Sequence, residues 1–150
     1  MKNIEFKMVD ISNKEETERI AEATGVVKMS EQTIKSIIEN KIPKGDVLST
    51  AQLAGITTAK KAYELIPLCH PLRITSIELE ITPDPDNKCI KIKSRVKANE
   101  RTGVEMEALS AVIGAALTIY DMCKAIDKRM IIDDVHLLFK KGGKSGEFKW

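Results

Sequence analysis

A chain of 150 residues with 43% hydrophobic and 31% charged side chains fits one soluble globular domain, residues 1–150, rather than a disordered segment. Its 24 basic and 22 acidic side chains leave a net charge of only +2, which argues against a strongly electrostatic nucleic-acid binder. With three Phe, two Tyr and one Trp, few aromatic rings remain to stack on the bases of a single strand.

The cysteines Cys69, Cys89 and Cys123 are far apart and have no CxxC spacing. This pattern is typical of reduced, mostly buried thiols in a reducing compartment. Because only His70 and His136 accompany them, we expect no metal site. The first residues lack the apolar core of a signal peptide, and no run approaches ~18 apolar residues, so we expect a cytoplasmic protein without a membrane segment.

The first half of the chain predicts two helices and an extended segment. Ser30 is a good N-cap for a short helix whose isoleucines recur at helical spacing. The sequence KIPKG at 41–45 ends that helix, and Asp46 is an N-cap for a second helix of small residues. Within it, Gly55 would let another backbone approach closely. The two prolines of LIPLCHPL at 65–72 then exclude further helix.

Two segments of alternating polarity follow, at 77–81 and 90–96, on either side of a turn rich in Pro, Asp and Asn. They predict an antiparallel hairpin with one buried face. On its exposed face, acidic residues of the first strand lie opposite basic residues of the second. We interpret the basic run as a solvated sheet face rather than an RNA-binding stripe formed by Lys91, Lys93, Arg95 and Lys97.

A long helix is predicted from about Gly103 to Lys128, and TGVE at 102–105 has the form of a capping box at its start. A last strand, roughly Met130–Phe139, leads into a tail rich in glycine and lysine. These elements predict an α+β fold with a ferredoxin-like antiparallel sheet and helices packed on one face. The expected apolar stripe of the long helix consists of Val104, Leu109, Val112, Ile113, Ala116, Leu117 and Tyr120.

Asp121 and Lys124 stand three residues apart on this helix, so their side chains are neighbours. Such a pair is often a surface ion pair that contributes little to stability. Here it lies in the apolar stretch IYDMCKAI, where burial would make an ionised pair costly to keep for stability alone. A partly desolvated lysine beside a carboxylate is a plausible proton carrier, so we consider the pair a catalytic candidate.

Glu105 and Glu107 are candidates near the start of the same helix, although a capping box and the helix dipole explain them equally well. Glu105 and Asp121 are 16 positions apart, which is about 24 Å along a straight helix. A single small-molecule pocket cannot easily reach both ends. We therefore expect a homo-oligomer in which two chains contribute opposite helix ends to one site.

Other residues could bind an anionic ligand. His70, held in an extended segment by Pro71, could orient a substrate or transfer protons, although such a histidine is more often structural. Cys69 is better explained as a small buried side chain than as a nucleophile. Lys140 and the lysines of the following glycine-rich tail could hold phosphate, and Lys44 beside Gly45 is a further cationic candidate.

Six segments together resemble one family, the cyclic pyranopterin monophosphate synthases, known as molybdenum cofactor biosynthesis protein C. The combination of LIPLCHP, TGVEMEAL and YDMCKA is specific, and the matching segments cover nearly the whole chain in order. The matching segments are Met8–Ser12, Lys44–Leu48, Leu65–Leu72, Thr102–Leu109, Ile119–Lys128 and Gly142–Phe148.

The resemblance implies a lyase that converts a 3',8-cyclised dihydro-GTP, made by a radical-SAM enzyme, into cyclic pyranopterin monophosphate and diphosphate. It also implies a homohexamer, a trimer of dimers with active sites at the dimer interface. No cofactor is implied, although Mg²⁺ could accompany the triphosphate. By motif position, Asp121 and Lys124 correspond to the acid–base pair. The substrate-binding positions are Lys44, Cys69, His70, Glu105, Met106, Glu107 and Lys140.

An alternative from another class is a non-catalytic module that senses a nucleotide or a phosphate. Ferredoxin-like subunits often assemble to bind ligands, and the fold does not determine the function. The feature that separates the two hypotheses is the Asp121/Lys124 pair, because a pure binding site has little use for it.

Overall fold

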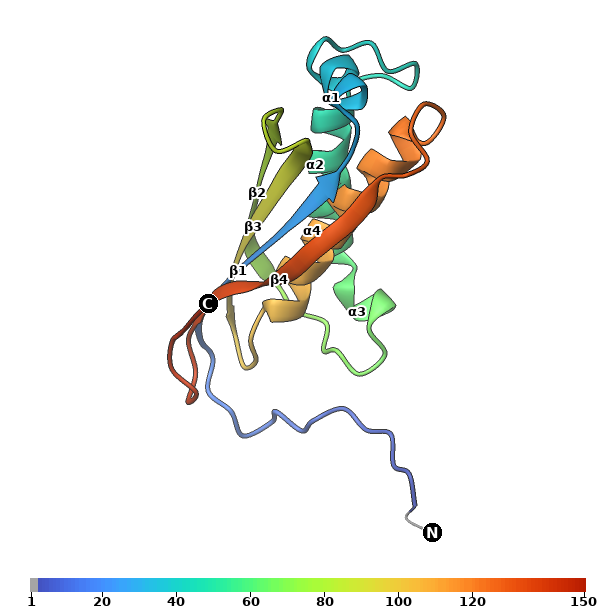
Figure 1. The fold of residues 1–150 in the computed structure, drawn as a ribbon. Helices are drawn as coiled ribbons and strands as arrows, with labels where there is room; N and C mark the ends of the chain where they lie inside the picture. Colours follow the sequence, from blue (N-terminus) through green and yellow to red (C-terminus); the bar gives the residue numbers. More distant parts are fainter. Residues whose placement is uncertain (1–2) are drawn as a thin grey trace.

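The computed structural model describes residues 3–150 and consists of a five-stranded antiparallel sheet with four helices (Figure 1). The strand order is β2-β3-β1-β4-β5, which is the ferredoxin-like order extended by one short strand. This confirms the predicted fold class. The elements are β1 (Thr17–Lys28), α1 (Glu31–Ile38), α2 (Val47–Lys60), α3 (Ala62–Leu65), β2 (Ile74–Asp84), β3 (Cys89–Glu100), α4 (Glu105–Cys123), β4 (Ile131–Lys141) and β5 (Phe148–Lys149).

The two predicted N-caps are confirmed at the starts of α1 and α2. The Ser30 side chain accepts a hydrogen bond from the Thr33 amide at 3.2 Å, and the Asp46 side chain accepts one from the Ser49 amide at 3.1 Å. Each bond satisfies an amide that has no partner within its helix. The sequence alone was sufficient here because a cap is made within four residues.

The predicted hairpin is formed by β2 and β3, with Glu78 opposite Arg95 and Glu80 opposite Lys93. On this face Lys91 forms an ion pair with Asp84 of β2 at 3.0 Å, whereas Lys93 and Arg95 pair with the neighbouring strand β1. Both cations contact Glu22 of β1, Arg95 at 2.6 Å and Lys93 at 3.6 Å. Glu22 therefore neutralises part of the basic run from a strand that lies 60 or more residues away in sequence. This is possible because β3 lies between β2 and β1 in the sheet.

Helices α2 and α4 lie together on one side of the sheet, as Figure 1 shows, and α4 contacts β1, β3 and β4. Their backbones approach closely at Gly55, where an added Cβ would lie 2.8 Å from the Ala111 carbonyl oxygen. This confirms the close approach predicted for Gly55. By length and composition α4 could cross a membrane, but 56% of that stretch is buried within the fold, as is usual for a core helix.

The buried face of α4 differs from the predicted stripe. Ile113 and Leu117 are 43% and 56% exposed. The helix packs against both the sheet and α2, so mostly small residues face these neighbours, while Ile113 and Leu117 point outward. The hydrophobic positions of α4 with at most 1% exposure are Ala108, Ala111, Val112, Ala115, Ala116, Ile119 and Cys123.

The predicted start of the long helix, about Gly103, is within two residues of the observed start at Glu105, but its capping box and its predicted end at Lys128 were wrong. The N-cap residue is Val104 and no side chain caps this end, so the predicted capping box does not form. The helix ends at Cys123 rather than Lys128, because the Cys123 carbonyl accepts hydrogen bonds from the amides of Ile126 and Asp127 in a turn. The Asp127 side chain instead accepts a 3.0 Å bond from the Ser30 amide, which ties this turn to α1.

Candidate active site

The candidate residues form two clusters at opposite ends of α4. The 19-residue helix separates Glu105 from Asp121 by about 24 Å, as expected from the sequence. One cluster, the carboxyl-end cluster, contains Lys44, Asp121 and Lys124. The other, the amino-end cluster, contains Cys69, His70, Glu105, Met106, Glu107 and Lys140.

In the carboxyl-end cluster, two lysines share one carboxylate. The Lys124 Nζ atom lies 3.1 Å from Asp121 Oδ1, and the Lys44 Nζ atom lies 3.2 Å from Oδ2 and 3.0 Å from the Asp121 carbonyl oxygen. The hydrogen bond from Lys124 and then that from Lys44 lower the pKa of Asp121, so its carboxylate is ionised at neutral pH. Lys44 reaches the pair because the turn before α2 lies beside the last turn of α4.

This cluster is more exposed than the sequence predicted. The side chains of Asp121 and Lys124 are 59% and 55% exposed in the single subunit. The expectation of a desolvated pair was wrong for the single chain, because Asp121 and Lys124 lie on the exposed side of the end of α4 rather than on its buried face.

In the amino-end cluster, the central group is the buried carboxyl of Glu107, whose residue is 3% exposed. Burial raises its pKa from 4.5 to about 7, and the nearby Glu105 charge adds to the rise. Its Oε1 atom lies 4.0 Å from the Cys69 Sγ atom, and its Oε2 atom has no hydrogen-bond partner among the described residues. This carboxyl is therefore poised to exchange a proton near neutral pH.

The remaining groups of this cluster lie around the first turn of α4. Lys140 Nζ is 3.8 Å from Glu105 Oε1, and Met106 is 37% exposed. The His70 Nε2 atom lies 2.7 Å from the carbonyl oxygen of Val9, so the histidine contacts the segment that precedes β1. Burial and the neighbouring Glu107 charge raise the pKa of the Cys69 thiol, which favours the structural role expected for it.

Sequence reasoning missed one buried charge, Arg19 of β1, which is only 6% exposed. Its Nε atom donates a 3.1 Å hydrogen bond to the Glu100 carbonyl oxygen. A signal was present, because Arg19 alternates with Ala21, Ala23 and Val27, and alternate residues of a strand share one face.

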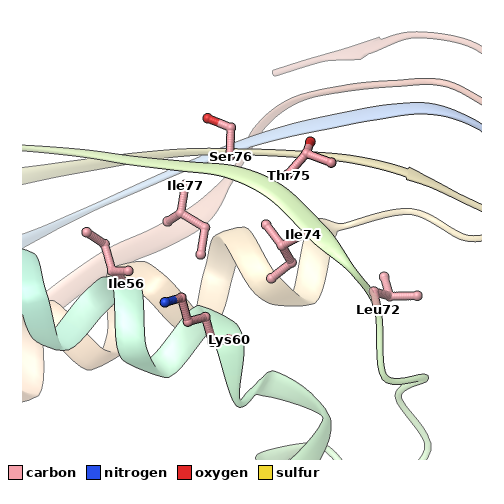
Figure 2. Close-up of a pocket in the computed structure, with 7 residues that line it drawn as sticks. All are labelled: Ile56, Lys60, Leu72, Ile74, Thr75, Ser76 and Ile77. Atoms are coloured by element: carbon pink, nitrogen blue, oxygen red, sulfur yellow. The ribbon is translucent and has the colours of Figure 1, made fainter.

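A separate cavity of about 260 Å³ lies between α2 and the edge strand β2 (Figure 2). Its apolar lining residues are Ile56, Leu72, Ile74 and Ile77, and its charged lining residue is Lys60. No predicted site residue lines this cavity. Among residues 3–150, no group of three or more His, Cys, Asp and Glu side chains is arranged to hold a metal ion.

Together, the ferredoxin-like fold and the ionisable groups define a class of small α+β protein with one polar cluster at each end of α4. The MoaC family matches residues 8–143, and the chain belongs to this family.

Three relatives carry the name cyclic pyranopterin monophosphate synthase. The protein of Rhodospirillum rubrum is 58% identical over 93% of this chain and 84% of its own length. That of Clostridium perfringens strain 13 is 56% identical over 95% and 90%. That of Desulfatibacillum aliphaticivorans is 52% identical over 95% and 89%.

Proposed function

We propose that this chain is a cyclic pyranopterin monophosphate synthase, a cytoplasmic lyase of molybdenum cofactor biosynthesis. It converts 3',8-cyclo-7,8-dihydroguanosine 5'-triphosphate, supplied by a radical-SAM enzyme, into cyclic pyranopterin monophosphate and diphosphate. The observation that carries the proposal is the carboxyl-end cluster, where Lys44 and Lys124 flank the Asp121 carboxylate at 3.2 and 3.1 Å. Family membership and the names of the relatives support it.

The proposed reaction needs proton transfers, because a guanine-derived ring opens and a cyclic phosphate closes. Lys124 is suited to deliver or remove a proton, and its Nζ atom lies 3.1 Å from Asp121 Oδ1, which fixes its position. Lys44 adds a second positive charge where phosphate oxygens would gather. Such charge-assisted hydrogen bonds accelerate the reaction only to the extent that they strengthen in the transition state.

The amino-end cluster is proposed to bind substrate. Glu107 can accept a hydrogen bond from a guanine-type N–H through its unpartnered Oε2 atom, and His70 can orient the ring. Lys140 is available for the phosphates, because its contact with Glu105 is long at 3.8 Å. The substrate-binding set remains Lys44, Cys69, His70, Glu105, Met106, Glu107 and Lys140. We propose no cofactor; any Mg²⁺ would arrive with the triphosphate.

The active site is proposed to form between two chains of a homohexamer, a trimer of dimers. Two observations support this assembly. The clusters lie about 24 Å apart along one helix, which is too far for a single small ligand. Asp121 and Lys124 are more than half exposed in the single chain, whereas proton transfer by a lysine benefits from a site that a second subunit covers.

The decisive experiment is to incubate the purified protein with the cyclised nucleotide and to measure diphosphate release together with the pterin product. A non-catalytic nucleotide- or phosphate-sensing module would bind the same nucleotide without releasing diphosphate. The RNA-binding hypothesis is weakened by the contacts of Lys93 and Arg95 with Glu22. Steeply salt-dependent RNA affinity would favour that hypothesis over ours.

A mixing experiment tests the shared site. Asp121→Ala and Glu107→Ala chains are each expected to be inactive alone, but co-assembled chains should recover part of the activity. Recovery is expected because some interfaces of the mixed oligomer contain one intact amino-end cluster and one intact carboxyl-end cluster. No recovery in oligomers that verifiably contain both chains would contradict a site shared between subunits.

A further inference from the structure

A polar cluster joins the turn after α4 to the start of α1. The Asp127 Oδ2 atom accepts hydrogen bonds from the Ser30 amide at 3.0 Å and from the Thr33 hydroxyl at 2.9 Å. Its Oδ1 atom accepts a 3.2 Å bond from the Arg129 amide. Thr33 is only 1% exposed, so the cluster is anchored in the interior of the protein. We call Ser30, Thr33 and Asp127 the α1–α4 tie.

The Asp127 carboxylate is held in its charged form. Desolvation alone would raise its pKa, but the hydrogen bonds from Ser30, Thr33 and Arg129 together outweigh burial, so the pKa is lowered. The carboxylate also lies at the amino end of α1, where the helix dipole favours a negative charge. Hydrogen bonds to an ionised acceptor are shorter and stronger than neutral ones, so the tie is a firm link between the two helices.

On the α4 side, the tie fixes the turn that carries Lys124. Lys124 is the C-cap residue of α4 and lies three positions before Asp127. Two amides, those of Ile126 and Asp127, donate to the carbonyl oxygen of the preceding helix residue at 3.0 and 3.1 Å. Because these bonds close a single tight turn, the position of Asp127 determines the direction in which the backbone presents Lys124.

On the α1 side, the tie fixes the segment that leads to Lys44. Ile34 and Ile37 pack in the core, and the chain beyond α1 is anchored by Ile42, which is 4% exposed. The Gly45 amide donates to the Ile42 carbonyl oxygen at 3.0 Å, which closes a turn around Lys44. Helix α1 packs mainly against β2 rather than α4. The tie and Lys44 therefore join opposite ends of this segment to the end of α4.

We propose that Asp127 is a positioning residue for the carboxyl-end cluster. It holds Lys44 and Lys124 at the spacing that places both beside the Asp121 carboxylate, at 3.2 and 3.1 Å. The inference rests on the proposed function for the reaction that this cluster performs. Asp127 acts through the backbone on both lysines, and a misplacement of about 1 Å in a catalytic group can lower a rate about 10²-fold.

The first test is a carboxylate NMR titration of Asp121 in the full-length protein. In Asp127→Ala the pKa of Asp121 should rise toward its ordinary value, because the two lysines are no longer held beside it. The direction is diagnostic, since removal of a neighbouring negative charge would by itself lower this pKa. Asp127→Asn also removes the charge but keeps a carbonyl oxygen that can accept from Ser30 and Thr33, so it should not raise the pKa of Asp121.

The second test is turnover of the cyclised nucleotide. Asp127→Ala should lower kcat about tenfold and change KM less than about twofold, because the amino-end cluster is intact. Asp127→Asn should restore kcat to within about threefold of the parent. Thr33→Val keeps the Asp127 charge and removes one donor, so kcat should fall about threefold. The matched control is Asp133→Ala, since Asp133 also accepts an amide bond and contacts a lysine but lies on β4.

Circular dichroism and thermal unfolding would establish that each variant folds, and Thr33→Val keeps the test valid if Asp127→Ala does not fold. An unchanged Asp121 titration and an unchanged kcat in both variants would overturn the assignment, as would an equal loss in Asp133→Ala. A loss in Asp127→Asn as large as that in Asp127→Ala would also overturn it, because the charge rather than the hydrogen bonds would then matter.

The two tests separate this inference from the proposed function. If the Asp121 titration shifts as expected but the parent protein does not turn over the cyclised nucleotide, the positioning role stands and the proposed function fails. If the parent turns over the nucleotide and neither Asp127→Ala nor Thr33→Val changes kcat or the Asp121 titration, the function stands and the positioning role fails.

Discussion

The two ends of α4 carry the same functional group in opposite electrostatic settings. At the amino end the Glu107 carboxyl is buried, forms no ion pair with a cation of residues 3–150, and has its pKa raised to about 7. At the carboxyl end Asp121 is exposed and flanked by Lys44 and Lys124, and its pKa is lowered. One helix thus presents a carboxyl that can hold a proton at neutral pH and another that cannot.

The two ends differ in the physical effect that determines the pKa of the carboxyl group. The helix dipole favours a negative charge at the amino end, by about 0.3–1 kcal/mol, and would lower the pKa of Glu107. Desolvation acts in the opposite direction and is larger there, so the pKa rises. At the other end the dipole opposes a carboxylate, but two ammonium groups within 3.2 Å outweigh it.

The largest expected effect is at the carboxyl end. Lys124→Ala should reduce turnover of the cyclised nucleotide by about 10²–10⁴-fold, the usual contribution of a general acid or base. Nucleotide binding should be retained, because the amino-end cluster is intact. Lys128→Ala is the matched control, since it removes an exposed lysine four residues further along the chain, beyond the end of α4. Full turnover in Lys124→Ala would contradict the assignment of Lys124 as a catalytic residue.

The next largest expected effect is a pH dependence of folding stability that arises at the amino end of α4. Because the folded-state pKa of Glu107 is above its unfolded value of 4.5, the native state holds this proton longer than the unfolded chain does. The contribution to stability is therefore present below pH 4.5 and is lost as pH rises to about 7. Its size is roughly 3 kcal/mol, from 1.36 kcal/mol per pKa unit.

Urea unfolding of Glu107→Gln and the parent chain at pH 5 and pH 8 would measure this difference at a fixed protein concentration. The free energy of unfolding of the Gln variant should fall much less from pH 5 to pH 8 than that of the parent, because position 107 then carries no titrating group. Glu78→Gln, a change at an exposed carboxylate of β2, should keep the pH dependence of the parent. An identical change in the free energy of unfolding between pH 5 and pH 8 in Glu107→Gln and the parent would show that Glu107 is not desolvated in solution.

A smaller effect is expected at Lys44. Lys44→Ala removes one of the two ammonium groups at Asp121, so the pKa of Asp121 should rise toward its ordinary value in a carboxylate NMR titration. Turnover should fall about tenfold, while thermal stability changes little because the pair is exposed. Lys41→Ala, which breaks only the exposed contact with Glu39, is the control. An unchanged Asp121 titration would mean that Lys44 does not occupy this position in solution.

The smallest effect concerns the long contact between Glu105 and Lys140. Glu105→Gln should change the free energy of unfolding by roughly 0–1 kcal/mol, because the partners are part-exposed and 3.8 Å apart. The KM for the cyclised nucleotide should change more than kcat, since the pair is assigned to binding. A loss in kcat as large as that of Lys124→Ala would contradict the division of roles between the two ends.

Several features could be predicted from the sequence because short-range physics determines them. The N-caps at Ser30 and Asp46 and the alternation of the β2–β3 hairpin involve neighbours within a few residues or a strict two-residue period. The ferredoxin-like fold class was predicted correctly, but its central strand β1 (Thr17–Lys28) was not among the predicted elements. The separation of Glu105 and Asp121 needed only the rise per residue of a helix.

Tertiary packing decided the rest, because it sets solvent access and brings distant residues together. Lys44 meets Asp121 across 77 positions of sequence. The burial of Glu107 and the exposure of Ile113 depend on where α2 and the sheet contact α4, so no local pattern of that helix revealed them. Arg19 is approached by Gly142 and Gly143 of the loop after β4, which come more than 120 residues later in the chain. The identities of the ionisable groups could be read from the chain, but their protonation could not, because a pKa depends on desolvation and on charges that only the folded structure positions.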